Sequence, residues 1–587
     1  MMRRLILLAL TVSAVQLAAQ SARKAPAFTV VEATIPEMQT AMRERRVTSR
    51  ELVTQYLTRI ALYDKQINAA ISINPRALED ADARDAERAA GRVRGPLHGI
   101  PIAIKDNIHT VGIPTTGGAL AFAGFLPPYD ATLTKNLREA GAVIIAKTVL
   151  TELANWVAGA PTPMPGNYSA VGGFAFNPYD PRPDPRASSD GGPVLSTGGS
   201  SSGAGTAANF WAANVGTDTA GSVVNPAMLT MLVGIRPTTG LISRYGIMPI
   251  TADQDTAGPM ARTVTDAAIL LGALVSAAPD PADAATTRCN VPPRRDYSAY
   301  LKADALKGAR IGIPRAFYYE SLPAPPEAAP AAAPPAGGAA AAGRGGRGGG
   351  RGGLNDAQTA LMNDAIDVLK RAGAVIVDPA NLPTVLDADP AQNILSFSIC
   401  SGVNNAKGRD GNCTVVLKYG MKRDFNAYLS TLGPAAPVKS LTELRAFNTA
   451  HARAGAIKYG QANLDISDEM DVVADAARYE ADRARDVRLA GDRGFKAAIE
   501  EHRLDALLFP GWNISNLASR PGYPEIVVPI GTVPSGGGGG ANPFPPGFDP
   551  KPSPYSAAFV GLPCSEPKLI GIAYAFEQLT KRRVPPK

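Results

Sequence analysis

The stretch "LTKNLREAGAVIIAK" (Leu133–Lys147) has the pattern of an amphipathic helix that passes through a glycine into an apolar strand. The same order returns in "AIDVLKRAGAVIV" (Ala365–Val377), and "GIPIAIKDN" (Gly99–Asn107) adds another short apolar strand. Unbroken apolar strands that alternate with helices are typical of sheets buried on both faces. We therefore predict an α/β fold with a large mixed and mostly parallel β-sheet that helices cover on both faces.

The composition allows a large core but includes sequence that cannot join it. Hydrophobic residues make up 45% and charged residues 19% of the 587 residues, which is enough for a sizeable core. Ala324–Gly353 is almost entirely Pro, Ala, Gly and Arg, so we predict a disordered insertion there. The apolar strand "ARIGIP" (Ala309–Pro314) precedes it and a helix begins near Asn355. The insertion is therefore expected to be a loop of the sheet and not a domain boundary.

The N-terminus has the pattern of a secretory signal peptide, residues 1–22. Arg3 and Arg4 precede an apolar run from Leu5 to Val15, and small residues follow at Ala18–Ala22. The run is too short for a typical membrane-spanning helix, although an uncleaved anchor is an alternative. We expect an exported protein, periplasmic or extracellular, with no stable membrane span.

The cysteines and histidines do not predict a metal site. The four cysteines lack C-x-x-C spacing, and the four histidines are scattered. In an exported protein, Cys400 and Cys413 are candidates for a short disulfide loop, and buried free thiols are the alternative. The net charge of +7 comes partly from a few arginine-rich places rather than one face, so no nucleic-acid partner is expected.

Two familiar motifs were considered for the chemistry. "GAVIIAKT" (Gly141–Thr148) nearly matches a phosphate-binding loop, but its interior is a buried apolar strand, which excludes that function. Gly199–Gly203 reads G-S-S-S-G and matches the nucleophile elbow of esterases, with Ser201 at its centre. That motif needs a preceding hydrophobic strand and a histidine base, for which His451 and His502 are the distant candidates. A serine esterase with Ser201 as nucleophile remains an alternative.

A lysine base offers a third chemistry. Lys105 ends the apolar strand "IPIAI", and burial there disfavours the ammonium form, so a neutral amine can accept a proton from a serine. The glycine-rich "GTDTAGS" (Gly216–Ser222) lets backbone N–H groups converge on one point. Converging donors are what a tetrahedral oxyanion requires.

Five motifs in chain order resemble the amidase signature family, in its peptide amidase-like branch. They are "GPLHGIPIAIKDNIHTVGIPTTGG", "TGGSSSGAGTAA", "GTDTAGSVVNPA", "GIRPTTGLISRYGIMPI" and "QDTAGPMARTVTDAA". The resemblance implies the amidase signature fold, as a single amidase domain over residues 23–587 with a signature core at about 90–274. It also implies an amidase that cleaves a carboxamide to a carboxylate and ammonia or an amine, without a metal or another cofactor.

The resemblance assigns roles to particular residues. Ser222 matches the nucleophile, Ser200 the relay serine that follows a cis peptide bond, and Lys105 the base. Together they form a Ser–Ser–Lys triad that works through an acyl-enzyme. The backbone amides that match the oxyanion hole and the side chains that match its supporting network are those of Thr219, Ala220, Gly221 and Ser222, and of Ser201 and Asp218.

The chain departs from the family pattern at several points. Ala220 replaces a glycine or aspartate, and Val224 replaces an arginine found two residues after the nucleophile in many members. The Ser200–Ser222 interval looks about two residues short, and we place the shortening in a helix around Ala208–Ala213. A proline-rich insertion, Pro181–Leu195, is expected near the active-site entrance.

The resemblance leaves the substrate open among small-molecule and peptide amides, with peptide C-terminal amides as one candidate. The signal peptide points away from the cytosolic glutaminyl-tRNA amidotransferase subunit of the same family. A non-catalytic protein that binds amides, or RNA through "RGGRGGGRGG" (Arg344–Gly353), is the alternative from another class. The oligomeric state is not predicted.

Overall fold

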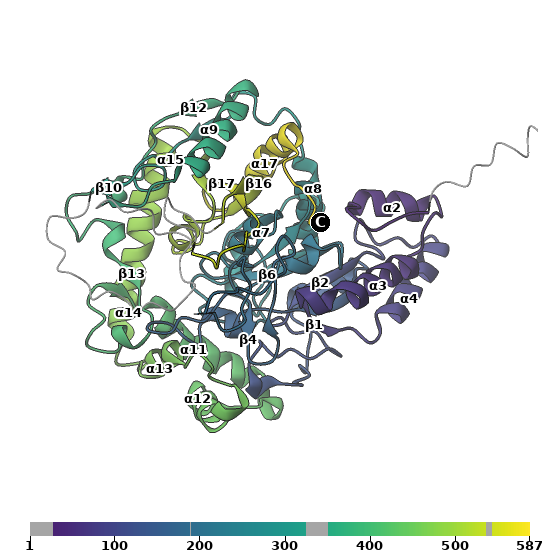
Figure 1. The fold of residues 1–587 in the computed structure, drawn as a ribbon, viewed down its shortest axis with the longest axis horizontal. Coiled ribbons are helices and arrows are strands. Elements are labelled where there is room, and N and C mark those ends of the chain that lie inside the picture. Colours follow the sequence, from purple (N-terminus) through teal and green to yellow (C-terminus); the bar gives the residue numbers. More distant parts are fainter. Residues whose placement is uncertain (1–26, 188, 324–349, 536–542) are drawn as a thin grey trace, which may run out of the picture.

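A computed structural model describes residues 27–187, 189–323, 350–535 and 543–587 (Figure 1). The predicted signal peptide and residues 324–349 of the predicted insertion lie outside the described residues. In this part of the chain, no helix is long and apolar enough to cross a membrane.

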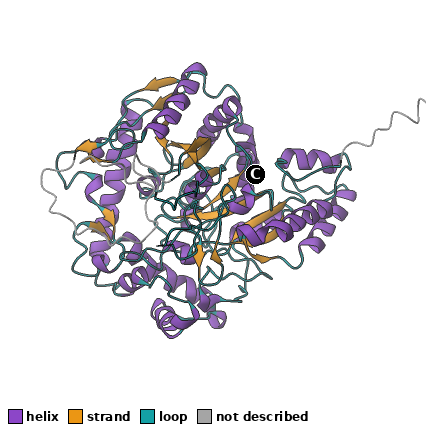
Figure 2. Cartoon of the chain, in the orientation of Figure 1, coloured by secondary structure: helices purple, strands orange, loops and turns teal. Residues whose placement is uncertain are grey.

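An eleven-stranded sheet organises the molecule, with helices around it (Figure 2). In spatial order its strands are β1 (Ala70–Ile73), β3 (Val143–Thr148), β2 (Pro101–Lys105), β6 (Ala213–Asp218), β8 (Thr256–Ala261), β7 (Val233–Arg236), β16 (Glu525–Val533), β17 (Ser553–Val560), β15 (Ala506–Pro510), β9 (Arg310–Gly312) and β12 (Val375–Val377). The predicted α/β fold with a large mixed sheet is confirmed.

Parallel pairing is concentrated on the two flanks of the sheet. β3, β2 and β6 are parallel on one side, and β15, β9 and β12 are parallel on the other. Both quoted helix–glycine–strand units supply strands to these flanks, as their pattern predicts. From β6 through β8, β7, β16 and β17 to β15, each strand pairs antiparallel with its neighbour.

Most of the helices surround this sheet. In chain order, the helices are α2 (Ile35–Arg43), α3 (Ser49–Ile67), α4 (Ala77–Ala89), α5 (Thr132–Glu139), α6 (Ala204–Ala207), α7 (Val224–Leu229), α8 (Val264–Leu274), α9 (Asp356–Arg371), α10 (Pro383–Leu386), α11 (Val416–Thr431), α12 (Leu441–Ala450), α13 (Ala462–Asp468), α14 (Ala476–Asp486), α15 (Ala497–Glu501), α16 (Ser515–Ala518) and α17 (Glu566–Thr580). A separate group, which includes α12 and α13, lies at the lower edge of Figure 1. A π-helical segment, Val487–Lys496, joins α14 to α15.

The sheet and the helices pack in two large hydrophobic cores. The larger core includes the buried strands of the sheet and the helices packed on it. The second core joins α11, α12 and α13 to the segment between residues 119 and 164 and to Met248 and Ile250. The site described below lies where these two cores meet.

The ends of the predicted insertion return to the body of the protein. β10 (Leu322–Pro323) pairs antiparallel with β11 (Gly350–Arg351), and the Gly353 amide donates to the Phe317 carbonyl at 2.8 Å. The last four residues of the segment predicted to be disordered are therefore part of the folded structure. The sheet continues after them with β12 and β15.

The segment between the two catalytic candidates differs from the expected helix at Ala208–Ala213. The helix is the single turn α6, and Asn209 ends it with a left-handed φ of 58°. The Phe210 amide then donates to the Gly205 carbonyl at 2.8 Å, and β6 begins at Ala213. This Schellman-type ending stops the helix one turn after it starts, because the backbone amides after Ala207 turn back to satisfy its carbonyl groups.

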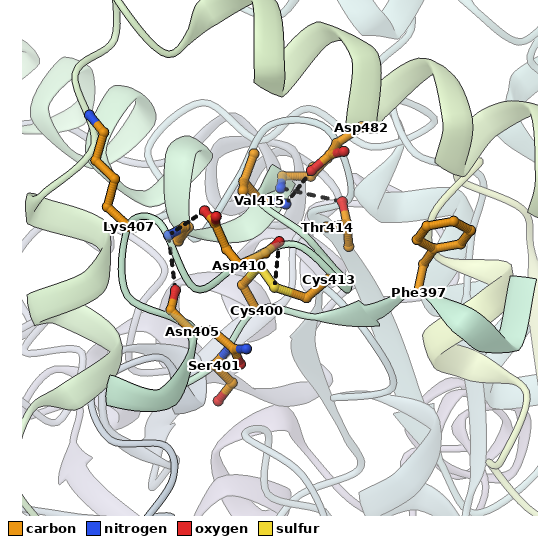
Figure 3. Close-up of a disulfide and its surroundings, with 12 residues drawn as sticks. Phe397, Cys400, Ser401, Asn405, Lys407, Asp410, Cys413, Thr414, Val415 and Asp482 are labelled. Carbon is orange, nitrogen blue, oxygen red and sulfur yellow. Dashed lines mark hydrogen bonds and ion pairs between the residues drawn. A yellow bond between two sulfur atoms is a disulfide. The ribbon is translucent and has the colours of Figure 1, made fainter. Parts of the chain in front are cut away.

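Both cysteine pairs form disulfides. Cys400 and Cys413 are linked with a Cα–Cα distance of 5.0 Å, so the disulfide alternative is confirmed (Figure 3). Cys289 is linked to Cys564 across 275 residues, a pairing that the spacing of the cysteines did not predict.

Candidate active site

Lys105 lies at the carboxyl end of β2, inside the sheet. β2 and β6 are parallel neighbours, with Ile104 opposite Val215. Because parallel strands end at the same edge, the end of β2 meets the end of β6, where Thr217 and Asp218 lie. The Lys105 side chain is fully buried, with Nζ 2.8 Å from Ser200 Oγ and 2.7 Å from Thr217 Oγ1.

Burial changes the protonation of this lysine. It lowers the pKa of Lys105 to about 7, because the ammonium form loses its hydration in the sheet. The carboxylates of Asp218 and Asp255 act in the opposite direction and moderate the fall in pKa. An amine with this pKa is largely neutral just above neutral pH, so Nζ can accept the Ser200 proton across the 2.8 Å contact.

Ser200 and Ser222 lie beside each other through their backbones. The Ser201 amide donates to the Ser222 carbonyl at 3.2 Å, and a Cβ built on Gly199 would lie 3.1 Å from Ser222 Cα and 3.5 Å from its Oγ. A side chain at position 199 would press on Ser222, because the two segments approach so closely. Ser200 is fully buried, whereas Ser222 is half-buried.

Two details of this pair differ from what the resemblance implies. Within the described residues, no hydrogen bond joins the hydroxyls of Ser200 and Ser222. The cis peptide bonds of the same residues precede Pro161 and Pro379, so the cis bond implied before Ser200 is not present.

Asp218 holds the turn that ends at Ser222. Its Oδ1 accepts the Gly221 amide and its Oδ2 accepts the Val223 amide, both at 2.7 Å. Gly221 adopts φ 112°, a conformation that favours glycine. Of the four amides matched to the oxyanion hole, that of Gly221 is thus directed to Asp218. Those of Thr219, Ala220 and Ser222 donate to no other group among the described residues.

Arg236, which the motif analysis did not single out, faces Asp218 from β7. Both side chains are fully buried, and Arg236 Nε lies 3.2 Å from Asp218 Oδ1. Its other nitrogens donate to the carbonyls of Tyr523 and Gln254, each at 2.8 Å. Val224, where the resemblance implies an arginine, is buried and apolar, so Arg236 supplies the cation that compensates Asp218. An arginine inside the otherwise apolar strand "VGIR" was the available signal.

Thr217 and Ser201 connect the lysine to the serine segment. Thr217 Oγ1, which also was not singled out, accepts from Asn107 Nδ2 at 3.2 Å besides contacting Lys105. The Ser201 hydroxyl donates to the Thr217 carbonyl at 2.9 Å and accepts the Thr217 amide at 3.1 Å. Ser201 is fully buried, and these bonds use its hydroxyl without a histidine. This geometry does not favour the esterase alternative.

A cavity of about 200 Å³ opens beside these groups. Thr217 and Thr219 line it, whereas Lys105, Ser200 and Ser222 do not, and α11 contributes Asp424, Ala427, Tyr428 and Thr431. Most of the remaining lining is apolar or aromatic: Tyr129, Ala154, Tyr245, Gly246, Ile247, Met248, Pro249, Ile250 and Ala252. Tyr129 and Tyr245 stack with their ring centroids 5.0 Å apart.

The charged side chains of the cavity are compensated within the protein. Arg244 Nε lies 2.7 Å from Asp283 Oδ2, and Arg423 Nε lies 2.7 Å from Asp424 Oδ1. Asp255 accepts hydrogen bonds on both carboxylate oxygens. The cavity therefore suits an uncharged apolar or aromatic group better than an ionised one.

The proline-rich insertion Pro181–Leu195 packs at another surface. Asp190 pairs with Lys458 at 3.1 Å, and the Arg182 guanidinium lies 4.2 Å from the Phe548 ring centroid. The described residues of this insertion do not line the cavity. Its effect on substrate access remains a prediction.

The described residues contain no group of three or more His, Cys, Asp and Glu side chains arranged to hold a metal ion.

The chain is similar in sequence to known amidases. A family model described as "Amidase" matches residues 51–333. A probable amidase from Arabidopsis thaliana is 32% identical over 574 residues, which cover 97% of this chain and 94% of that protein.

Two solved structures extend the likeness to the fold. A native peptide amidase from Stenotrophomonas maltophilia is 34% identical, with a TM-score of 0.73 and coverage of 95% of this chain and 98% of that chain. An amidase family protein from Bacillus anthracis is 30% identical, with a TM-score of 0.73 and coverage of 95% and 93%. The likeness thus extends well beyond the matched motifs.

Proposed function

Because this chain belongs to the amidase signature family and is an amide-hydrolysing enzyme, we propose that Lys105, Ser200 and Ser222 form its catalytic triad. The observation that carries the proposal is the buried Lys105 amine, 2.8 Å from Ser200 Oγ and with a pKa of about 7. A lysine in this state is a base, whereas a hydrated surface lysine is a cation at the same pH.

In the proposed first half-reaction, Ser222 Oγ attacks the amide carbonyl carbon. The Ser222 proton passes to Ser200, and the Ser200 proton passes to Lys105 Nζ. This relay requires the two serine hydroxyls to come into contact when substrate binds, as catalytic hydrogen bonds often tighten only in the complex. The oxyanion accepts from the free amides of Thr219, Ala220 and Ser222, while Asp218 keeps the turn in shape through Gly221.

In the second half-reaction, the protonated Lys105 returns its proton through Ser200 to the leaving nitrogen. The carbon–nitrogen bond breaks, and an ester of Ser222 remains. Water then attacks this acyl-enzyme and gives its proton to the same relay, which releases the carboxylate and restores Ser222. Ser201 supports this arrangement by fixing the Thr217 backbone.

Peptide C-terminal amides are the substrates that we propose first. The likeness to the peptide amidase of Stenotrophomonas maltophilia supports this choice, as does a cavity lined by tyrosines and apolar side chains. An uncharged side chain beside the scissile amide would fit such a lining.

We further propose that residues 23–587 form one amidase domain and that the protein is exported. Strands from residues 70 to 560 in one sheet support a single domain. The predicted signal peptide, residues 1–22, and the two disulfides support an oxidising compartment.

A fluorophosphonate probe tests the nucleophile without knowledge of the natural substrate. We expect covalent label on Ser222 of the wild-type protein, and none on Ser222→Ala. Ser202→Ala is a matched control, because Ser202 is a buried serine of the same segment that lies outside the proposed triad. Label on Ser201 instead would support the esterase mechanism and contradict the triad.

A further inference from the structure

We propose that Asp255 is a positioning residue that holds the oxyanion turn against the wall of the cavity through Thr219. This inference rests on the proposed function, because it concerns how the turn Thr219–Ser222 keeps its amides in place. The resemblance to the amidase signature family implies a role for the Thr219 amide, but none for its side chain or for Asp255.

The register of the sheet brings these two residues together. β6 and β8 pair antiparallel, and the last pair of the ladder is Asp218 opposite Thr256. The next residues along the two strands are Thr219 and Asp255, which therefore face each other. The Thr219 hydroxyl donates to Asp255 Oδ1 at 2.5 Å.

The other oxygen of the same carboxylate belongs to the cavity wall. Asp255 Oδ2 accepts the amides of Ile250 at 2.8 Å and Thr251 at 3.0 Å. Ile250 lines the cavity, as do Thr219 and Asp255 themselves. One carboxylate thus connects the turn that would hold the oxyanion to the wall that would hold the substrate.

Asp218 and Asp255 hold different parts of this turn. The Asp218 carboxylate accepts the amides of Gly221 and Val223, which follow Thr219 in the chain. The Thr219 amide itself donates to no other group among the described residues, so the side-chain contact with Asp255 is the hydrogen bond that restrains this residue. The β-branched threonine has few χ1 positions, and the bond to Asp255 selects one of them.

The charges around Asp255 agree with an ionised acceptor. Arg244 attracts its charge from the cavity side, whereas Asp424 repels it, and Lys105 lies close enough to respond to it. Burial raises the pKa of Asp255 to about 6, while the hydrogen bonds from Thr219 and Ile250 oppose that rise. At neutral pH the carboxylate can therefore accept all three hydrogen bonds.

The test compares Thr219→Val with Thr219→Ser. Valine keeps the shape of threonine but has no hydroxyl, and serine keeps the hydroxyl. We expect Thr219→Val to slow fluorophosphonate labelling of Ser222 by about 10- to 100-fold, less than the roughly 100- to 1,000-fold loss when an oxyanion donor is removed outright. For a peptide amide, kcat should fall with KM little changed, and Thr219→Ser should recover most of the rate.

A double-mutant cycle checks that Asp255 acts through Thr219. Asp255→Leu should slow labelling, and adding Thr219→Val should cost little more, because leucine has no acceptor and the two changes remove one shared contact. Asp424→Asn is the matched comparison: it alters an acidic residue of the same cavity that accepts the Ala252 amide but does not touch the turn. We expect it to raise KM more than it lowers kcat.

Three results would overturn the inference. Thr219→Val could label at the wild-type rate, Thr219→Ser could lose as much rate as Thr219→Val, or Asp424→Asn could lose as much kcat as Thr219→Val. In each case the wild-type protein would still label at Ser222, so the proposed triad would stand. Absence of label from the wild-type protein would contradict the triad itself. Thermal unfolding of each variant identifies any loss that comes from misfolding.

Discussion

The turn at the end of β6 and helix α11 both line one cavity, but they are held in different ways. Lys105, Asp218 and Arg236 are buried within the sheet, and Arg236 compensates the charge of Asp218 there. α11 instead packs in the second hydrophobic core and is anchored by a disulfide-closed loop. The family model covers residues 51–333, which include the turn but not α11. On the proposed mechanism, we therefore expect changes at the buried ion pair of the turn and changes at the anchor of α11 to have different effects.

The anchor of α11 is a lysine near its beginning. Lys418 is buried, and its Nζ lies 3.1 Å from Asp410, Glu469 and the Asn405 carbonyl. Asn405 and Asp410 belong to the loop that the Cys400–Cys413 disulfide closes, as Figure 3 shows. The same helix then presents Asp424 and Tyr428 to the cavity.

The largest expected effect is the loss of the base. Lys105→Met keeps an unbranched side chain in the sheet but removes the amine, so kcat for a peptide amide should fall by at least about 10⁴-fold. The protein should remain folded, because a buried amine that is costly to ionise has been removed. Stopped assays measure kcat, and thermal unfolding shows whether the variant remains folded. Activity near the wild-type level would show that another group is the base.

The next effect tests the ion pair of the turn. Arg236→Met leaves the buried Asp218 carboxylate without its cation, which should lower the free energy of unfolding by about 3–5 kcal/mol. Urea unfolding measures the change. Arg46→Ala, which breaks an exposed pair with Glu44, is the control and should cost no more than about 1 kcal/mol. Equal changes in both variants would refute the distinction between the two environments.

A smaller effect is expected from the disulfide beside α11. Replacing Cys400 and Cys413 by serine opens a short loop, which should cost about 3 kcal/mol of stability. Because this loop anchors α11, KM should rise while kcat stays close to the wild-type value. Serine replacement of Cys289 and Cys564, which do not line the cavity, should lower stability without raising KM. A fall in kcat alone would contradict the proposed division of roles.

The smallest effect is in the pH profile. The base must be neutral, and the pKa of Lys105 is about 7, so kcat/KM should fall about tenfold for each pH unit below that value. Activity is therefore lost toward acid pH and retained above neutrality. The charge of Asp255 raises the pKa of Lys105, so Asp255→Asn should move the acid limb to lower pH. A limb that does not move would show that another group controls it.

Much of the site follows from local sequence. A lysine that ends an apolar strand predicts a buried amine, and glycines around two serines predict close backbone approach and a tight turn. Lys105 and Ser200 are 95 residues apart, yet the motifs that resemble the amidase signature family include both residues, which lie 2.8 Å apart in the structure. The roles of Arg236, Thr217 and Asp255 were missed because each depends on which strands become neighbours.

By itself, then, the sequence determined the α/β class and the presence of parallel strands, because hydrophobic period acts along the chain. The resemblance of its motifs to the amidase signature family supplied the candidate residues of the chemistry. Tertiary structure alone decided the antiparallel centre of the sheet, the pairing of Cys289 with Cys564, and the facing of Thr219 and Asp255. The physical reason is that strand order and register depend on packing between distant segments. A local pattern specifies which face of a strand is buried, but not which strand lies beside it.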